Sequence, residues 1–187
     1  MKIDEYQIDF LNKYEQDLLN DCLGYATQAS YLNGQLFETI DITELWDEIA
    51  PEYMADAVPN VTQYPLVAIA WAAYLGVAYA HLWDKDWESF NEEPNPYKYV
   101  VGVRGFDMMD EYVCNELIQI GYESPEGQAL ESMLRSMAEI CQNRIKKEQI
   151  EPQSQLAFHV FARSVKVMYR IGAAIELARL GYKYEKL

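Results

Sequence analysis

Apolar residues recur at intervals of three and four positions along most of the chain, which is the spacing of one face of an α-helix. The first such stretch begins at Tyr6 and Phe10 and continues to Leu32. No segment shows the strict alternation of apolar and polar residues that indicates a half-buried strand. The pattern therefore predicts an all-α fold, an irregular bundle of about five to seven helices. The helices are expected near residues 4–32, 41–58, 63–87, 106–120, 124–149 and 153–181.

Local signals indicate where these helices begin and end. Asp41 and Glu44 have the spacing of a capping box, which predicts the start of the second helix, and Pro51 is expected to divide that helix into two short pieces. Ser124 precedes a proline and a glutamate, a combination typical of a helix start. Residues 88–99 contain two prolines among polar residues and are expected to form a loop.

Two glycines are expected to end helices. Gly121 and Gly181 each follow an apolar helical stretch and precede a tyrosine. Glycine adopts the left-handed backbone conformation that closes many helices, because it has no Cβ to clash with the preceding turn. We therefore expect both residues to have positive φ.

The third predicted helix differs from the others because residues 65–83 carry no formal charge. Such a stretch is long enough to cross a bilayer. However, six of its residues are alanine, and it also contains Pro65, Gly76 and His81, so its insertion into a membrane would gain little. Nearby charges are mainly acidic, so no cluster of Lys or Arg supports a membrane orientation. We therefore expect the central buried helix of a soluble bundle near residues 63–87, and no membrane partner.

This central helix has two distinct sides. Trp71, Tyr74 and His81 share a stripe that can line a pocket for a flat or polar ligand, or can simply belong to the core with backbone partners for the polar atoms. On another side, small residues recur every four positions and form a ridge that lets a second helix approach closely. The ridge consists of Ala68, Ala72, Gly76 and Ala80.

Composition favours a single all-helical domain over residues 1–187, because half of the residues are hydrophobic and 13% are aromatic. The first ten residues lack both a basic start and a continuous apolar run, so the sequence as written does not begin with a secretory signal. Three cysteines lie far apart in apolar helical patterns, which indicates buried thiols in a reducing compartment. The expected location is the cytoplasm.

The chain is strongly acidic, with a formal net charge of -15. Nucleic acid is therefore not an expected partner, because neutralisation of phosphates dominates such binding. The charge is also uneven: residues 1–134 contain 25 acidic and 5 basic residues, and residues 135–187 contain 5 acidic and 10 basic residues. The two parts either pair with each other inside one domain or present faces of opposite sign.

Motifs for catalysis are scarce. The two histidines do not occur in a metal-binding helical motif, the cysteines form no Cys-x-x-Cys pair, and no phosphate-binding loop or nucleophile elbow is present. One acidic group remains, because Asp107, Asp110 and Glu111 are expected on one side of the fourth helix. Three carboxylates at that spacing repel one another unless they face water or a cation, and Mg²⁺ is the cation that such a set can hold.

A basic group lies on the last predicted helix. His159, Arg163, Lys166 and Arg170 recur at helical spacing and form a narrow stripe, expected to lie opposite a core face that includes Phe158. In an acidic protein this stripe can hold an anion or an acidic segment. The alternative is that it is solvated, or pairs with acidic residues of the same chain.

Three functional hypotheses follow. The first is a non-enzymatic acidic binding protein, of inhibitor or immunity type, that recognises a basic protein partner. The second is a metal-dependent hydrolase of phosphate esters such as nucleotides, with Mg²⁺ on the acidic group and the basic stripe stabilising developing charge. The third is a helical domain that binds a small ligand at the aromatic stripe. Only the second requires a cofactor, and a homodimer is compatible with all three.

Overall fold

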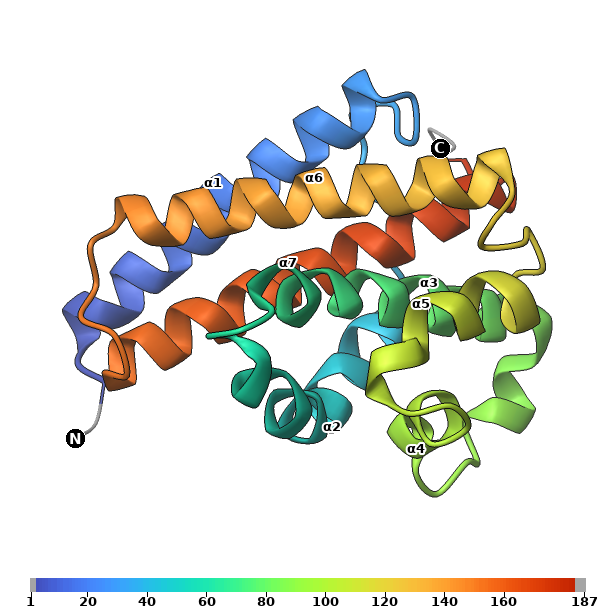
Figure 1. Cartoon of the computed structure of the whole chain (residues 1–187), viewed down its shortest axis with the longest axis horizontal. Helices are drawn as coiled ribbons and strands as arrows, with labels where there is room; N and C mark the ends of the chain where they lie inside the picture. The colour runs from blue at the N-terminus through green and yellow to red at the C-terminus, as the bar shows by residue number, and fades with distance from the viewer. Residues whose placement is uncertain (1–2, 184–187) are drawn as a thin grey trace.

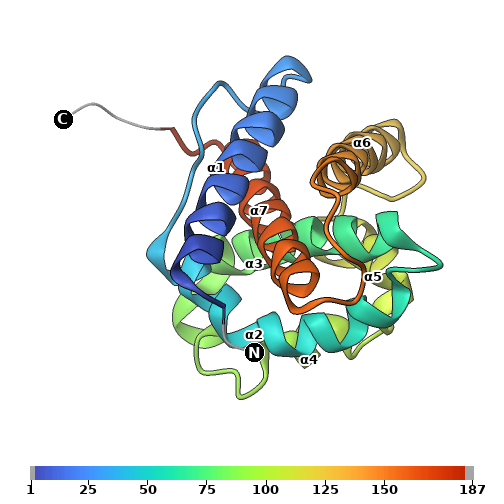
Figure 2. The same cartoon turned by 90° about the vertical axis from the view of Figure 1, so that its left-hand side faces the viewer.

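Two long helices, α3 (Pro65–Phe90) and α7 (Gln155–Arg179), cross at the centre of the molecule and share its most extensive helix–helix interface (Figure 1). α1 (Glu5–Gln28) packs along α7, α6 (Pro125–Lys147) packs mainly against α3 and also contacts α1 and α7, and α2 (Ile40–Ala57) contacts both central helices (Figure 2). The computed structural model describes residues 3–183, and no strand occurs in that range. The predicted all-α bundle with a central apolar helix is confirmed.

Short elements complete the fold between α2 and α6. They are the 3₁₀ turns η1 (Val58–Asn60) and η2 (Phe106–Met108), the short helices α4 (Pro96–Val101) and α5 (Met109–Tyr112), and the π-helical turn η3 (Val113–Leu117). The predicted helix at 106–120 is therefore three short elements in sequence. The predicted loop at 88–99 is also wrong at both ends, because α3 continues to Phe90 after a kink at Asp86 and α4 begins at Pro96. Proline is compatible with the first turn of a helix, where its missing N–H has no partner to lose.

The second helix also departs from the prediction. α2 is continuous from Ile40, and Pro51 lies inside it, exposed on its outer side. Proline removes only one backbone hydrogen bond there, while the buried face of α2 packs against α3 and α7. The helix is capped by the side chain of Thr39, which accepts a hydrogen bond of 3.1 Å from the backbone N–H of Ile42, and not by Asp41.

The close crossing of α3 and α7 depends on glycine. A Cβ built on Gly172 would overlap the carbonyl group of Ala73, and a Cβ on Gly76 would overlap the backbone at Tyr169 and Ala173. Gly76 belongs to the predicted ridge of small residues, all of which are buried. The ridge therefore allows the two central backbones to meet, as its spacing predicts.

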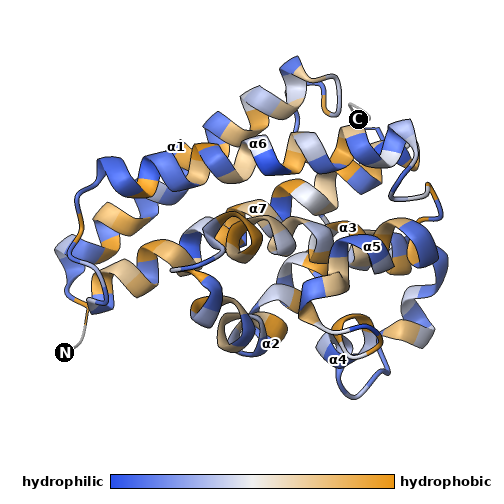
Figure 3. Cartoon of the chain, in the orientation of Figure 1, coloured by the Kyte–Doolittle hydropathy of each residue, from blue (hydrophilic) through white to orange (hydrophobic). Residues whose placement is uncertain are grey.

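α3 is the one helix among the described residues that is long and apolar enough to cross a membrane, but 78% of its apolar window is buried inside the protein. Such burial is typical of the core helix of a soluble bundle. In Figure 3, hydrophobic and polar residues alternate along α1 and α6, as amphipathic helices around such a core require. All three cysteines are free and buried, as predicted.

The core contains several buried tyrosines whose hydroxyls have partners. The hydroxyl of Tyr53 donates to the carbonyl of Ala68 at 2.6 Å, and that of Tyr169 donates to the carbonyl of Ile42 at 2.7 Å. Burial raises the pKa of both phenols, so they remain neutral donors. These bonds fix α2 against the central pair of helices.

Candidate functional site

The predicted aromatic stripe of α3 does not form one shared pocket. The Nε1 of Trp71 donates to the carbonyl of Phe106 at 2.6 Å, and the ring of Trp71 contacts the edge of Tyr74 with ring centroids 5.5 Å apart. The Nδ1 of His81 lies 3.0 Å from the Oε2 of Glu176, an almost fully buried carboxylate of α7. Trp71 and Tyr74 therefore pack against each other, while His81 contacts α7.

Tyr74 is the exception among the buried tyrosines. Its hydroxyl is the one buried side-chain polar atom without a hydrogen-bond partner in the part of the chain that the structure describes. Burial raises the pKa of the Tyr74 phenol, and the neighbouring Cys114 and Asp110 raise it further. The same surroundings raise the pKa of the Cys114 thiol to about 12, chiefly through burial. This cluster is a neutral, buried part of the core at neutral pH, Asp110 aside.

The three predicted metal ligands do not share one exposed face. Asp110 is buried and its Oδ1 accepts a hydrogen bond of 2.8 Å from the backbone N–H of Glu111, while Asp107 is exposed. Burial raises the pKa of the Asp110 carboxyl. Among residues 3–183, no group of three His, Cys, Asp or Glu side chains has the arrangement of a metal site. Magnesium binding stays an untested prediction.

The basic stripe of α7 faces acidic residues of the same chain. Glu15 of α1 lies 3.4 Å from the Nη1 of Arg163, 3.9 Å from the Nζ of Lys166 and 4.0 Å from the Nη1 of Arg170. Arg170 also reaches Glu38 at 2.5 Å. Three of the four predicted anion-binding residues are therefore engaged within the chain, and among the described residues no ion pair joins them to the acidic group on η2 and α5. The remaining member, His159, packs edge-on against the Phe158 ring at 5.7 Å.

The arginines outside the basic stripe are also paired with acidic residues. Each of the six arginines forms an ion pair with a carboxylate of the chain. The surplus acidic charge is concentrated most clearly on α2, which contains six acidic residues and no basic one. On α2, Glu44, Asp47 and Glu48 are exposed and form no hydrogen bond or ion pair with the described residues. These three residues are called the acidic row below.

An apolar groove lies next to the acidic row, between the second half of α2 and the beginning of α7. Its main hollow has a volume of about 750 Å³. The α2 side and η1 contribute Pro51, Met54 and Val58, and α7 contributes Phe158, His159 and Ala162. A second hollow of about 360 Å³ shares Val58 and Phe158 with the first and continues the groove along η1.

Two large apolar side chains are exposed in this groove. Phe158 is 47% exposed and Val58 is 42% exposed. The sequence pattern placed Phe158 on the core face of its helix, and this is wrong: nearly half of the side chain is exposed where it lines the groove. Exposed apolar side chains that gather in a concave surface are a mark of a binding site.

The acidic row borders the groove because of helical geometry. With 3.6 residues per turn, Glu44 and Glu48 lie beside Pro51 and Ala55, and Asp47 itself lines the main hollow. Other ionisable residues are rare here, since His159 is the one further ionisable residue that lines the hollow. The result is an apolar channel with an acidic edge.

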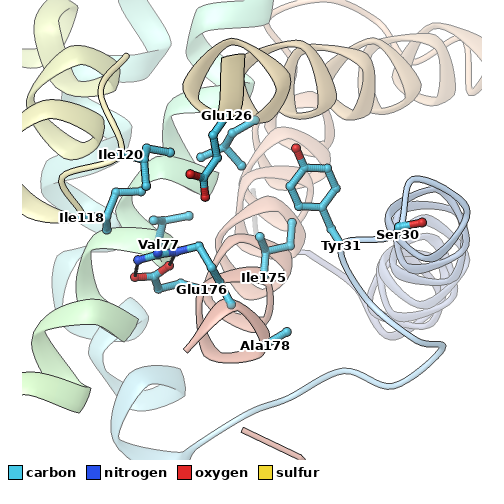
Figure 4. A pocket seen from close by; sticks show the side chains of 11 residues that line it. Ser30, Tyr31, Val77, Ile118, Ile120, Glu126, Ile175, Glu176 and Ala178 are labelled. Carbon is cyan, nitrogen blue, oxygen red and sulfur yellow. Dashed lines mark hydrogen bonds and ion pairs between the residues drawn. The ribbon is translucent and has the colours of Figure 1, made fainter. Parts of the chain in front are cut away.

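A separate pocket of about 230 Å³ lies at the other end of α7 (Figure 4). It is bounded by α3, the turn after α1, the segment before α6 and the first turn of α6. Glu176 and Arg179 form its floor, and Glu126 and Tyr31 point toward its interior. Of the predicted aromatic stripe, His81 contacts Glu176 of this pocket, and Val77 of the same helix lines the pocket.

Sequence reasoning found neither the groove nor the pocket. The available signals were the six acids without a base on α2 and a glutamate, Glu176, inside an otherwise apolar helical stretch. The groove also depends on where α2 ends relative to α7, which no local pattern encodes.

Comparison with known proteins gives no relative: no protein-family model, no curated protein and no solved structure matches the chain.

Proposed function

We propose that this protein is a non-enzymatic binding protein whose groove between α2 and α7 receives a basic amphipathic helix of a protein partner. The observation that carries the proposal is the acidic row beside an exposed apolar groove. Apolar side chains of the partner would occupy the hollow beside Met54, Val58 and Phe158. Its lysines or arginines would lie along Glu44, Asp47 and Glu48.

A helix is the occupant that suits this surface. Helix-in-groove recognition uses apolar anchors at positions i, i+3, i+4 and i+7, with charged residues on the flanks. The groove is long and apolar, and its charge lies on one edge, which matches that division of a helix into an apolar face and a basic flank. Fatty acids and other anionic amphiphiles are opposed by the acidic row, because like charges repel at short range.

The rest of the molecule supports the same proposal. The chain has 30 acidic and 15 basic residues, and this excess negative charge attracts a basic partner over distance. All six arginines already pair with other carboxylates of the chain, so none of them offsets the acidic row. Such attraction raises the association rate and weakens with salt. We also propose a cytoplasmic location, since three buried free cysteines fit a reducing compartment.

Calorimetric titration with designed peptides tests the proposal. The ligand is an amphipathic helical peptide made of leucine and lysine, and the controls are a scrambled peptide and one with glutamate in place of lysine. The leucine–lysine peptide is expected to bind, and the two controls are expected to bind more weakly by about tenfold or more. Equal binding of the scrambled peptide would show attraction by net charge alone and contradict a helix-binding groove.

Two variants place the binding on the groove. The triple variant Glu44→Gln, Asp47→Asn, Glu48→Gln is compared with Asp9→Asn, Glu88→Gln, Glu139→Gln, which removes the same charge from exposed positions elsewhere. Only the first triple variant is expected to weaken binding of the leucine–lysine peptide. Ala55→Trp adds a large ring at an exposed position on the α2 wall and is expected to block the groove. If both groove variants bind like the unmodified protein, the proposal is wrong.

A further inference from the structure

The pocket at the end of α7 is separate from the groove at its beginning. Phe158 in the groove and Glu176 in the pocket are 18 positions apart on one helix. At a rise of 1.5 Å per residue, this separation is about 27 Å. The pocket and the groove are therefore two separate candidate sites.

The floor of the pocket is an internally balanced ion pair. Glu176 is 1% exposed, and its carboxylate accepts hydrogen bonds from the Nε and Nη2 of Arg179 at 2.5 and 2.9 Å. His81 adds a third contact, with its Nδ1 3.0 Å from the Oε2 of Glu176. With these partners, Glu176 has little capacity left for a ligand, and Arg179 is occupied as a bidentate donor. The floor orders the pocket and contributes little net charge.

The remaining charge in the pocket is a single carboxylate. Glu126, an exposed residue in the first turn of α6, points its carboxylate into the pocket toward Val77 and Glu176, across from the ring of Tyr31 (Figure 4). Glu126 forms no ion pair with any residue that the structure describes. Its charge contributes to raising the pKa of the Arg179 guanidinium, after the larger effect of Glu176. The nearness of Glu126 also contributes to raising the pKa of the Tyr31 phenol, after burial. Glu126 and Tyr31 therefore line the same pocket from two sides.

Tyr31 reaches this position through an unusual turn. The preceding residue, Ser30, has a φ of 68°, a left-handed conformation that residues other than glycine adopt at some cost. The turn directs the chain from the end of α1 back over the pocket. Tyr31 is half-buried there.

The walls are apolar. Val77, Ile118, Leu130 and Ile175 line the interior between the polar groups. A volume of about 230 Å³ exceeds that of an engineered cavity of about 150 Å³ that binds benzene in another protein. An aromatic ring or a short branched chain therefore fits.

We propose that this pocket binds a small organic cation, a primary amine with a compact apolar body. The ammonium group would donate hydrogen bonds to Glu126 and to the Tyr31 hydroxyl, and the apolar body would lie against Val77, Leu130 and Ile175. The charge-assisted bond to Glu126 selects a cation, because a carboxylate ligand would be repelled by the unpaired Glu126, while the Glu176–Arg179 pair adds little net charge.

Ligand-detected NMR and calorimetry with phenethylamine test this proposal. Phenethyl alcohol is the neutral counterpart, and phenylpropionate is the anionic one. Phenethylamine is expected to bind at millimolar or lower concentration, about tenfold or more tightly than the alcohol, while the anion is expected not to bind. No binding of the amine at millimolar concentration, or equal binding of the alcohol, would overturn the proposal.

Variants assign the binding to the pocket. Glu126→Gln is expected to lower the affinity for phenethylamine by about tenfold or more. The matched control is Glu123→Gln, an exposed position nearby that does not line the pocket, and it is expected to bind as before. Ala178→Phe fills the pocket from the half-buried wall of α7 and is expected to abolish binding. Unchanged affinity in both Glu126→Gln and Ala178→Phe would overturn the assignment, and neither variant touches the groove.

Discussion

Gly172 on α7 lies so close to Ala73 on α3 that no larger residue fits between the two helix backbones. The chain thereby brings its two central helices into backbone contact. Both the groove at the start of α7 and the pocket at its end depend on this crossing, because it fixes α7 relative to α2 and α3.

Gly172→Ala is therefore expected to destabilise the protein. A Cβ at this position overlaps the carbonyl of Ala73, so the helices must separate, and overpacking of this kind costs about 1–3 kcal/mol or more. Urea unfolding followed by tryptophan fluorescence measures the change.

Gly24→Ala is the matched control. Gly24 lies inside α1, and a Cβ there meets nothing within 4 Å. Alanine favours the helix over glycine by about 0.5–1 kcal/mol, so this variant is expected to be more stable than the unmodified protein. Equal effects of the two substitutions would contradict the close-packing account.

Glu15 is expected to matter more than its position on the outer side of the bundle suggests. It lies among Arg163, Lys166 and Arg170, and Glu15→Gln leaves these cations facing one another with less compensation. We expect a loss of about 1 kcal/mol, smaller at high salt, in a urea titration. Asp17→Asn, which removes the partner of an exposed lysine, is expected to leave the unfolding midpoint unchanged.

The buried carboxyl of Asp110 makes stability depend on pH. Burial raises its pKa above the ordinary value of 3.8, so the folded protein holds this proton more tightly than the unfolded chain does. Stability then falls as pH rises from 3.8 through the folded pKa. Asparagine does not titrate and can still accept the hydrogen bond from the Glu111 N–H.

Asp110→Asn should therefore gain stability relative to the unmodified protein as pH rises, with the largest gain at neutral pH. Urea midpoints at a series of pH values, measured at low protein concentration, give the comparison. A relative loss of stability with rising pH would show that the charged carboxylate is stabilised in the folded protein.

The cysteines provide a kinetic prediction. All three are buried, and the pKa of Cys114 is raised to about 12, so reactive thiolate is scarce at neutral pH. Labelling by an aromatic disulfide reagent is expected only at the rate of unfolding, with three thiols reacting in denaturant. Rapid labelling of one cysteine in the folded protein would contradict this burial.

The helical framework was predictable because it depends on local patterns. Gly121 and Gly181 have φ of 77° and 98°, as expected for helix ends, and the side chain of Ser124 caps α6 by accepting from the Gly127 N–H at 3.0 Å. Patterns of this kind involve residues that are close in sequence. Pro51 was misread because a helix whose buried face is well packed tolerates the loss of one hydrogen bond.

The candidate sites were not predictable because they join distant segments. The basic stripe on α7 gave no sign that Glu15, about 150 positions away, would compensate it. Likewise, Phe158 has the spacing of a core residue, but it lines an open groove and is 47% exposed. Periodicity identifies an apolar face but not what covers that face.

The most direct test of the proposed function is methyl NMR during titration with the leucine–lysine peptide. The methyl resonances of Met54, Val58 and Ala162 in the groove are expected to shift. Those of Ala26, buried on α1, and Val77, at the other pocket, are expected to keep their chemical shifts. Shifts confined to methyl groups outside the groove, or no shifts at saturating peptide, would contradict the proposal that the groove between α2 and α7 receives a basic helix.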